Sequence, residues 1–165
     1  MFVPILAGPP FTIEVFEEES EDRLTVTVPL AQCDATSSIV TIDSHLAETW
    51  VDEFFHEFSF EITVTSFWDD EPPFTTQNRN MAAPYIPTGI RSLVMDVVCE
   101  SCRSLITAGK PDRIYRVTKE RHPPEPALRK HHMLTAVIQD CGYAMVRSGT
   151  DSWGRVFWMM DRIRR

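Results

Sequence analysis

Cys99 and Cys102 are the residues whose type and spacing most directly suggest a metal or redox site. A zinc site needs four ligands, usually from a second cysteine pair or from a spaced pair of histidines. The other cysteines, Cys33 and Cys141, stand alone in the sequence. The pair also falls inside a helical pattern rather than at a helix start, where a thiolate would be stabilised. The sequence therefore predicts no metal site, no disulfide framework and a reducing compartment.

Candidate acid–base residues follow an expected strand at 113–118. Glu120 and His122 come directly after this strand, and Tyr143 opens the last pair of expected strands. A group that transfers protons in catalysis must lie within hydrogen-bond reach of the reacting atom. We take Glu120, His122 and Tyr143 as catalytic candidates, although no motif assigns a role to any of them.

Two adjacent histidines, His131 and His132, lie in an expected helix. Neighbouring residues of a helix point about 100° apart, so at most one of the two rings faces a given site. Trp153 and Trp158 near the end of the chain could stack on a base, but their first interpretation is a hairpin tip and sheet packing.

Length and composition indicate one domain that spans 1–165. A chain of 165 residues with 43% hydrophobic and 24% charged residues can bury a core of its own. It contains no run of about 18 apolar residues, which argues against a membrane span. The apolar start lacks a basic segment and holds three prolines before residue 11, so we expect no cleavable signal peptide.

Charge is divided unevenly along the chain. Residues 1–75, the acidic half, carry 16 acidic groups and one basic group, whereas residues 76–165, the basic half, carry 8 acidic and 15 basic groups. The two halves could face each other or present separate solvated faces. Alternatively, the molecule could assemble head to tail or bind an acidic and a basic partner at once. The basic residues form no dense cluster with aromatic residues, so nucleic acid is not the expected partner.

The first half of the chain predicts strands and one helix. Alternating residues indicate a hairpin of strands 11–16 and 24–30, joined by an acidic connector. A short strand at 38–42 is followed by a helix that Asp43 or Ser44 caps and that ends near Phe58. A wide apolar stripe supports this helix; it consists of Leu46, Trp50, Val51, Phe54, Phe55 and Phe58. Strict alternation then predicts a strand at 60–67, and we expect it to pair in the same sheet as the second half.

Two segments show no periodic pattern. Residues 1–10 read as an extended arm that packs on its own domain or on a neighbour. Residues 69–87 contain four prolines and read as a long loop. Because the loop also holds Phe74 and Tyr85, we expect an ordered lid or contact arm rather than a linker.

The second half predicts a helix, a strand, a second helix and two closing strands. The first helix spans 88–108 and ends at Gly109 and Pro111, as helix C-termini prefer. The strand 113–118 is anchored by Ile114 and Val117. The remaining elements are a helix over 126–141 and strands over 143–147 and 155–160.

This second half resembles the C-terminal half of the GNAT superfamily of acyl-CoA N-acyltransferases. The likeness rests on the helix led by Pro87-Thr88-Gly89-Ile90-Arg91, the strand 113–118, the helix 126–141 and Cys141-Gly142-Tyr143, which stands where the family often has Leu-Gly-Phe. It covers about 75 residues, here taken as 88–160. It implies an α+β fold in which a single mixed sheet is flanked by about three helices.

The resemblance also implies where acetyl-CoA would bind. The family holds the pyrophosphate on backbone N–H groups of a glycine-rich turn at a helix N-terminus. This places the cofactor-binding candidates at Thr88, Gly89, Ile90 and Arg91. However, prolines ahead of this turn lack N–H donors, and Ile90 and Arg91 are bulky where small residues help.

These departures lead us to expect a noncatalytic GNAT-fold structural or assembly protein without a cofactor. Small GNAT-like proteins of this kind are encoded among the virion genes of tailed phages. The expected partners are other protein subunits, in a homo-oligomer or a larger particle, and the expected location is a virion or the host cytoplasm. The alternative is an acetyl-CoA-dependent N-acyltransferase with an atypical cofactor turn. An enzyme predicts two central parallel strands that splay apart, with free N–H groups lining the gap. A contact protein predicts that side chains fill the gap and that its arm or loop is buried on a neighbour.

Overall fold

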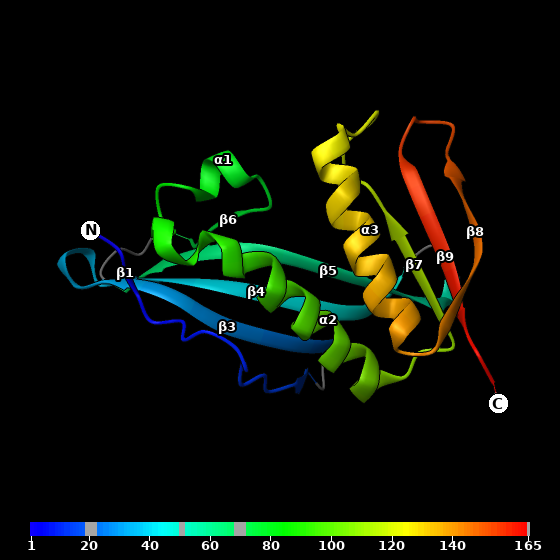
Figure 1. Cartoon of the computed structure of the whole chain (residues 1–165), viewed down its shortest axis with the longest axis horizontal. Helices are drawn as coiled ribbons and strands as arrows, with labels where there is room; N and C mark the ends of the chain where they lie inside the picture. Colours follow the sequence, from blue (N-terminus) through cyan, green and yellow to red (C-terminus); the bar gives the residue numbers. More distant parts are fainter. Residues whose placement is uncertain (19–22, 50–51, 68–71, 165) are drawn as a thin grey trace.

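The computed structural model describes residues 1–18, 23–49, 52–67 and 72–164 (Figure 1). Its strands are β1 (Val3–Pro4), β2 (Phe16–Glu18), β3 (Arg23–Cys33), β4 (Ser38–Thr49), β5 (Asp52–Ser66), β6 (Phe74–Thr76), β7 (Arg113–Val117), β8 (Tyr143–Thr150) and β9 (Val156–Arg162). Its helices are α1 (Arg79–Ala82), α2 (Val94–Gly109) and α3 (Glu125–Asp140), with 3-10 turns η1 (Asp34–Thr36) and η2 (Thr88–Leu93).

The described strands form one mixed sheet, as expected for an α+β fold. The sheet has nine strands, with the order β1-β3-β4-β5-β7-β9-β8, while β2 pairs with β3 and β6 pairs with β5. The pair β5–β7 is parallel and the other pairs are antiparallel. The first half of the chain therefore joins the same sheet as the second half, as predicted.

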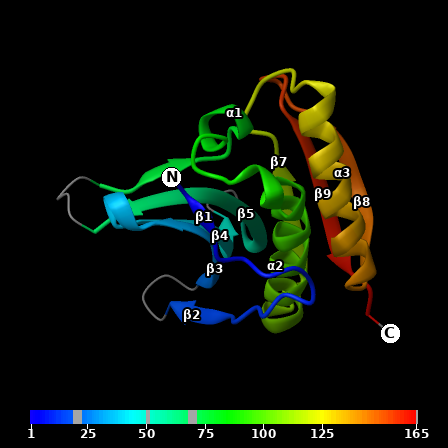
Figure 2. The ribbon, with the colours of Figure 1, turned by 60° about the vertical axis from the view of Figure 1, so that its left-hand side comes forward.

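The two long helices lie side by side on one face of this sheet (Figures 1 and 2). Helix α2 packs on β3 and β4, and α3 packs on α2 and β8. Fully buried aliphatic side chains fill the layer between α2 and the sheet, each contributing roughly 1.5–3 kcal/mol to stability. They include Val26, Leu30, Val40, Ile42 and Leu46 of the strands, and Val97, Val98, Leu105 and Ile106 of the helix.

The predicted helix from Asp43 or Ser44 to Phe58 is wrong. Strand β4 continues to Thr49, and β5 begins at Asp52. Because β4 pairs with both β3 and β5, ladder hydrogen bonds on both sides outweigh the local helical pattern. Within β4 every second side chain up to Leu46 is buried, but one of these inward positions is the polar Ser44, which hid the alternation. Trp50 and Val51, which the helical stripe included, lie outside the described residues.

The two segments without a pattern are partly ordered against the body of the protein. In the arm, Val3–Pro4 pairs with β3, and Phe2 lies edge-on to Tyr85 with ring centroids 5.7 Å apart. The expected long loop holds strand β6 and helix α1, so it is not structureless, although residues 68–71 lie outside the description. Its Phe74 also contacts Tyr85, at 5.7 Å between centroids.

The hairpin near the N-terminus is present but shifted. Its first strand is at Phe16–Glu18 rather than 11–16, and it pairs with the start of β3. Residues 11–15 make no strand pairs; three of their apolar side chains instead pack against the core, namely Phe11, Ile13 and Val15.

The second half follows the predicted order of elements with two local differences. The helix expected from Thr88 begins as the 3-10 turn η2 and becomes α-helical only at Val94. Its left-handed C-cap residue is Lys110, with φ of 46°, rather than Gly109. Strands β8 and β9 and helix α3 lie within a few residues of their predicted bounds.

Candidate functional site

The parallel strands β5 and β7 diverge after a short contact. They pair only at Phe55–Arg113, His56–Ile114 and Glu57–Tyr115. Farther along β5, residues Ile62–Val64 pair with β6. This pairing uses the same edge of β5 as β7 does, because β4 occupies the other edge. Residues 58–61 of β5 therefore have no strand partner on this side among the described residues. We call this opening the fork.

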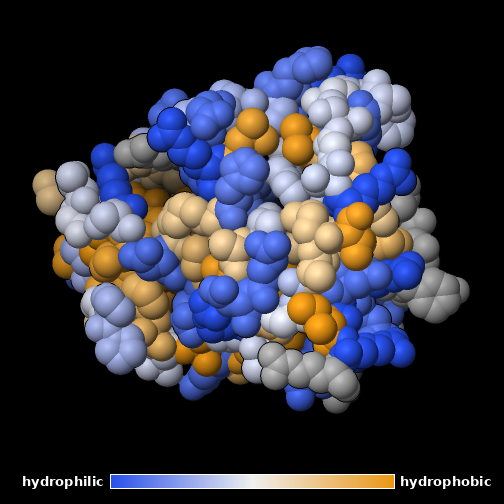
Figure 3. Space-filling view, turned by 45° about the vertical axis from the view of Figure 1, so that its right-hand side comes forward, coloured by the Kyte–Doolittle hydropathy of each residue, from blue (hydrophilic) through white to orange (hydrophobic). Residues whose placement is uncertain are grey.

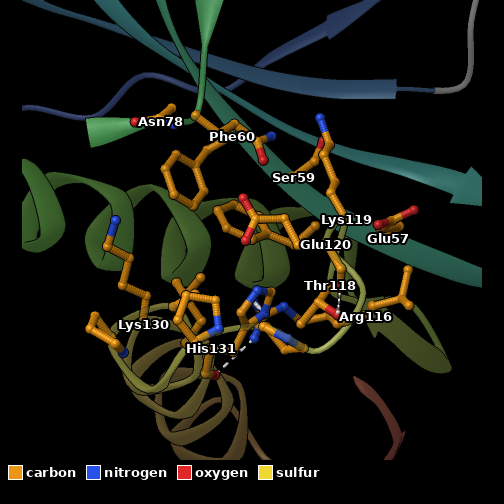
Figure 4. Close-up of a pocket in the computed structure, with 18 of the residues that line it drawn as sticks. Glu57, Ser59, Phe60, Asn78, Arg116, Thr118, Lys119, Glu120, Lys130 and His131 are labelled. Atoms are coloured by element: carbon orange, nitrogen blue, oxygen red, sulfur yellow. Dashed lines mark hydrogen bonds between the residues drawn. The ribbon is translucent and has the colours of Figure 1, made fainter. Parts of the chain in front are cut away.

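A cavity of about 450 Å³ occupies the fork, and we call it the fork cleft (Figure 4). Its walls come from residues 57–60 of β5, residues 116–120 at the end of β7, and residues 77, 78 and 80. The loop before α3 contributes Pro123 and Pro124, and the first turns of α3 complete the cleft with Pro126, Lys130 and His131. In Figure 4, Phe60 and Asn78 lie on one side, Arg116 and His131 on the other, and Glu120 between them.

Alternation along β5 brings side chains from both faces of the sheet to the fork cleft. Phe58 pairs with Leu46, whose side chain lies against α2 at Gly109, so Phe58 and Phe60 point toward the helices. Glu57 and Ser59 point to the opposite face by the period of two. A ligand in the cleft could therefore contact side chains from both faces.

Arg116 is the buried charge of the fork cleft, with 3% of its surface exposed. Its Nη1 donates to the backbone oxygen of His131 at 3.1 Å, and its Nη2 lies 2.9 Å from His131 Nδ1. Its guanidinium also lies over the ring of Trp158, 5.9 Å from the centroid. Burial lowers the pKa of Arg116 to about 10, so the side chain stays charged at neutral pH.

His131 is stacked on Trp158 with ring centroids 4.9 Å apart. Burial, followed by the nearby charge of Arg116, lowers the pKa of His131 to about 4. The neutral ring can then accept a hydrogen bond from Arg116 at Nδ1. The ring of the exposed His132 lies edge-on to Trp158, with 6.1 Å between the ring centroids. Of the two adjacent histidines, His131 lines the cleft and His132 does not, as expected.

Glu57 is the acidic residue of the cleft whose environment favours the neutral form. Burial raises its pKa, while Arg116, Lys119 and Arg155 act in the opposite direction. A carboxylate with a raised pKa is better suited to general acid–base work near neutral pH than an ordinary one. Among the residues that line the fork cleft, Glu57 is therefore the best candidate for a general base. It was not among the catalytic candidates predicted from the sequence.

The three acid–base candidates from the sequence are not brought together. Glu120 lines the fork cleft. His122 lies in the loop before α3, and its backbone N–H donates to Gly154 O at 2.8 Å. Tyr143 is buried; its hydroxyl donates to Pro111 O at 2.6 Å, and burial raises its pKa to about 12.

The four cofactor-turn candidates lie outside the residues that line the fork cleft. Thr88, Gly89, Ile90 and Arg91 form η2, where the N–H of Ile90 donates to Pro87 O at 3.1 Å. The guanidinium of Arg91 turns back on the preceding segment. It donates to Ile86 O at 3.0 Å and to Ala83 O at 2.6 Å.

Two residues of the cleft, Arg116 and Glu57, were not among the candidates predicted from the sequence, for different reasons. Arg116 is two positions from the buried Ile114, so strand alternation alone puts both side chains on one face. The sequence had suggested Val117 as the second buried anchor of this strand, but the structure buries Arg116 instead and leaves Val117 half-buried. Glu57 carried no such signal, because its segment was taken as a helix.

Metal ligands and membrane spans were searched over the described ranges. There, no three histidine, cysteine or acidic side chains gather as they would around a metal ion. None of the helices there combines the length and the apolarity needed to cross a bilayer.

Comparison with known protein families, characterised proteins and solved structures found no match to this chain. The site therefore has to be interpreted from its own geometry.

Proposed function

We propose that the chain is a divergent GNAT-fold protein that acts through protein contacts rather than catalysis, as a structural or assembly component of a phage-type particle. The order α2, β7, α3, β8 and β9 supports the GNAT part of this proposal, because the resemblance noted for residues 88–160 rests on a helix, a strand, a second helix and two closing strands in that order.

The observation that carries the noncatalytic part is the internal use of the cofactor turn. A pyrophosphate at this helix start would need N–H groups directed at it. Instead, Arg91 crosses the turn to bind the carbonyls of Ala83 and Ile86, and Ile90 donates its N–H to Pro87. The turn is thereby stabilised as a structural element of this chain.

The distribution of charge supports assembly. The acidic half supplies β1 to β5, which extend from the left of Figure 1 into its middle, whereas the basic half supplies α2 across the middle and β7, α3, β8 and β9 at the right. Opposite ends of two molecules would attract each other. On the face shown in Figure 3, hydrophobic residues form separate groups among hydrophilic ones, so electrostatic attraction is better suited than one apolar patch to drive contact.

Sedimentation velocity at low and high salt tests the assembly proposal. We expect the purified chain to self-associate at low salt and to sediment as the 18.9 kDa monomer at high salt, because salt screens exposed charges. The double variant Glu14→Gln and Glu17→Gln, which neutralises two exposed acids, should weaken the association. A monomer at every salt concentration would contradict head-to-tail assembly.

An acyltransferase is the second candidate function, and the fork favours it. The two central strands do splay apart, as an enzyme of this family requires, and Glu57 lies in the opening with a raised pKa. In this role Glu57 would take a proton from the attacking amine. This candidate predicts saturable binding of acetyl-CoA, which the first does not.

A further inference from the structure

The free edge of β5 in the fork is a gap within the sheet. Residues 58–61 lie between the last pair with β7, at Glu57, and the first pair with β6, at Ile62. The opposite wall does not return to close this gap, because the N–H of Thr118 donates to Val156 O at 2.9 Å, on the side of β9. Within the described part of the chain, no turn or loop supplies a backbone hydrogen bond to residues 58–61.

The backbone of this edge faces the fork cleft. The N–H and C=O groups of successive residues point to alternate edges of a strand, so every second residue of 58–61 directs both groups at the fork. Glu57, Phe58, Ser59 and Phe60 all line the cleft, although their side chains alternate between the two faces of the sheet. Consecutive residues of a strand share only its edge, so unpaired backbone donors and acceptors bound the cleft.

An extended peptide is the ligand whose chemistry matches such an edge. Unpaired N–H and C=O groups of a strand are a template for another strand, and strand addition is a recurring mode of peptide recognition. Residues 58–61 offer roughly 13 Å of open edge, at about 3.3 Å per residue. A short added strand therefore fits between β6 and β7.

The helix side of the cleft favours apolar side chains in this peptide. Phe60 of β5, Ala127 and Leu134 of α3, and the prolines at 123, 124 and 126 line it. Figure 4 shows Ser59 and Phe60 on the wall opposite Lys130 and His131. Because a strand presents alternate side chains to each face, every second residue of a bound peptide would meet the apolar wall.

The remaining lining residues favour polar side chains without a net charge. Ser59 and Glu57 point to the face opposite the helices, by the period of two. Lys119 and Lys130 balance Glu57 and Glu120 in sign around the cleft. The other positions of the peptide therefore suit hydroxyl or amide side chains.

We propose that the fork cleft binds an extended peptide segment of a partner protein, which adds a short strand to residues 58–61 of β5. Its apolar side chains alternate with uncharged polar ones, the apolar set facing α3. This site rests on the proposal that the protein acts through contacts, and it gives the place of one such contact. It uses no group of the η2 turn.

The capped peptide acetyl-Val-Thr-Val-Thr-Val-amide is the probe for this site. In the wild type, backbone amide resonances of residues 58–61 should shift and saturate as the peptide is added. Hydrogen exchange of the amides that face the fork should slow about tenfold at ten times the Kd of the peptide, because the bound state protects them. Resonances that neither shift nor saturate would overturn the proposal.

Two control peptides test the ladder and the apolar wall in the wild type alone. The same sequence with every backbone nitrogen methylated keeps the side chains but lacks the N–H donors, so it should not bind. Acetyl-Ser-Thr-Ser-Thr-Ser-amide keeps the donors and should bind at least about tenfold more weakly, since burying one valine contributes about 1.5–3 kcal/mol. Binding of either control as tight as that of the probe would contradict the proposed mode.

Two substitutions on α3 locate the peptide. Ala127 is half-buried and lines the cleft, so Ala127→Trp should fill the cleft and abolish binding. Met133 is 44% exposed and does not line the cleft, so Met133→Trp should bind as the wild type does. Equal binding by both variants, each with a cooperative thermal unfolding transition, would place the peptide elsewhere and refute the site.

Pantetheine, an extended chain that also carries amides, is the competing ligand. If pantetheine shifts the amides of residues 58–61 and the peptide does not, the proposal is wrong. Failure of the peptide to bind while the chain still self-associates at low salt would reject this site alone. Peptide binding by a chain that stays monomeric at every salt concentration would reject head-to-tail assembly alone and support the site.

Discussion

At the scale of single residues, His131 shows how the fork cleft controls protonation. The ring is stacked on Trp158 and its Nδ1 lies 2.9 Å from Arg116 Nη2; burial, followed by the charge of Arg116, lowers its pKa and so favours the neutral form. Its pKa is about 4 in the folded protein, compared with an ordinary value of 6.5. The ring therefore acts as a fixed hydrogen-bond acceptor for Arg116 over the whole physiological range.

This pKa shift predicts a loss of stability in mild acid. Between about pH 6.5 and about pH 4, the unfolded chain takes up a proton at His131 and the folded chain does not, so the free energy of unfolding falls as the pH drops through this window. His131→Asn, which keeps an acceptor but does not titrate, should reduce the difference in stability between about pH 7.5 and about pH 5. Urea unfolding at the two values measures it.

The adjacent exposed His132 provides the control for this measurement. His132→Asn should keep the wild-type difference between the two pH values, since that ring only meets the edge of Trp158. An equal effect of both substitutions would show that the buried position of His131 is not the cause.

For single residues, the sequence predicted the burial of side chains that follow a local periodic pattern. It did not predict the environment of side chains that depends on which strands pair with each other. Trp158 was assigned to sheet packing and Trp153 to a hairpin tip, and they are 4% and 59% exposed, respectively. The environment of Glu57 depends on where β5 and β7 separate, which involves residues some 60 positions apart. No local pattern contains that information.

At the scale of elements, the end of α2 shows a residue in a conformation that it rarely adopts. Lys110 has φ of 46° and donates its N–H to Ile106 O at 2.9 Å, which closes the helix. Glycine adopts this left-handed conformation without the steric cost that a side chain brings, about 1–2 kcal/mol. The sequence predicted that the helix ends at this point, but through Gly109 and Pro111 rather than through Lys110.

Lys110→Gly should therefore stabilise the protein, by about 0.5–1 kcal/mol once the greater freedom of the unfolded chain is subtracted. Lys110→Ala is the matched control, since it removes the same side chain without relieving the strain, and it should not stabilise. Chemical denaturation of the three proteins measures the difference. Equal stability of the Gly and Ala variants would show that the C-cap conformation contributes nothing.

The elements that were predicted correctly are those with one buried face and a clear terminator. Helix α3 begins with prolines and ends before Gly142, and β7 alternates over its whole length. The segment 43–58 failed because it joins a buried serine, an acidic run and aromatic residues into a pattern with the helical period. Only its pairing with β3 and with the distal part of β5 makes it strand, and tertiary pairing of this kind overrides local propensity.

At the scale of the whole molecule, the sheet divides the chain into two charged ends joined at the fork. The β5–β7 contact is three residue pairs long, and the fork cleft opens directly beyond it.

The central claim is that the turn at Thr88–Arg91 does not hold acetyl-CoA and that the protein acts through contacts. Isothermal titration of the wild type with acetyl-CoA tests this claim most directly. We predict no saturable heat between about 1 μM and about 1 mM acetyl-CoA, the range of typical enzyme KM values, because Arg91 and Ile90 are engaged within the turn. Saturable micromolar binding would contradict the account and establish the acyltransferase candidate in its place.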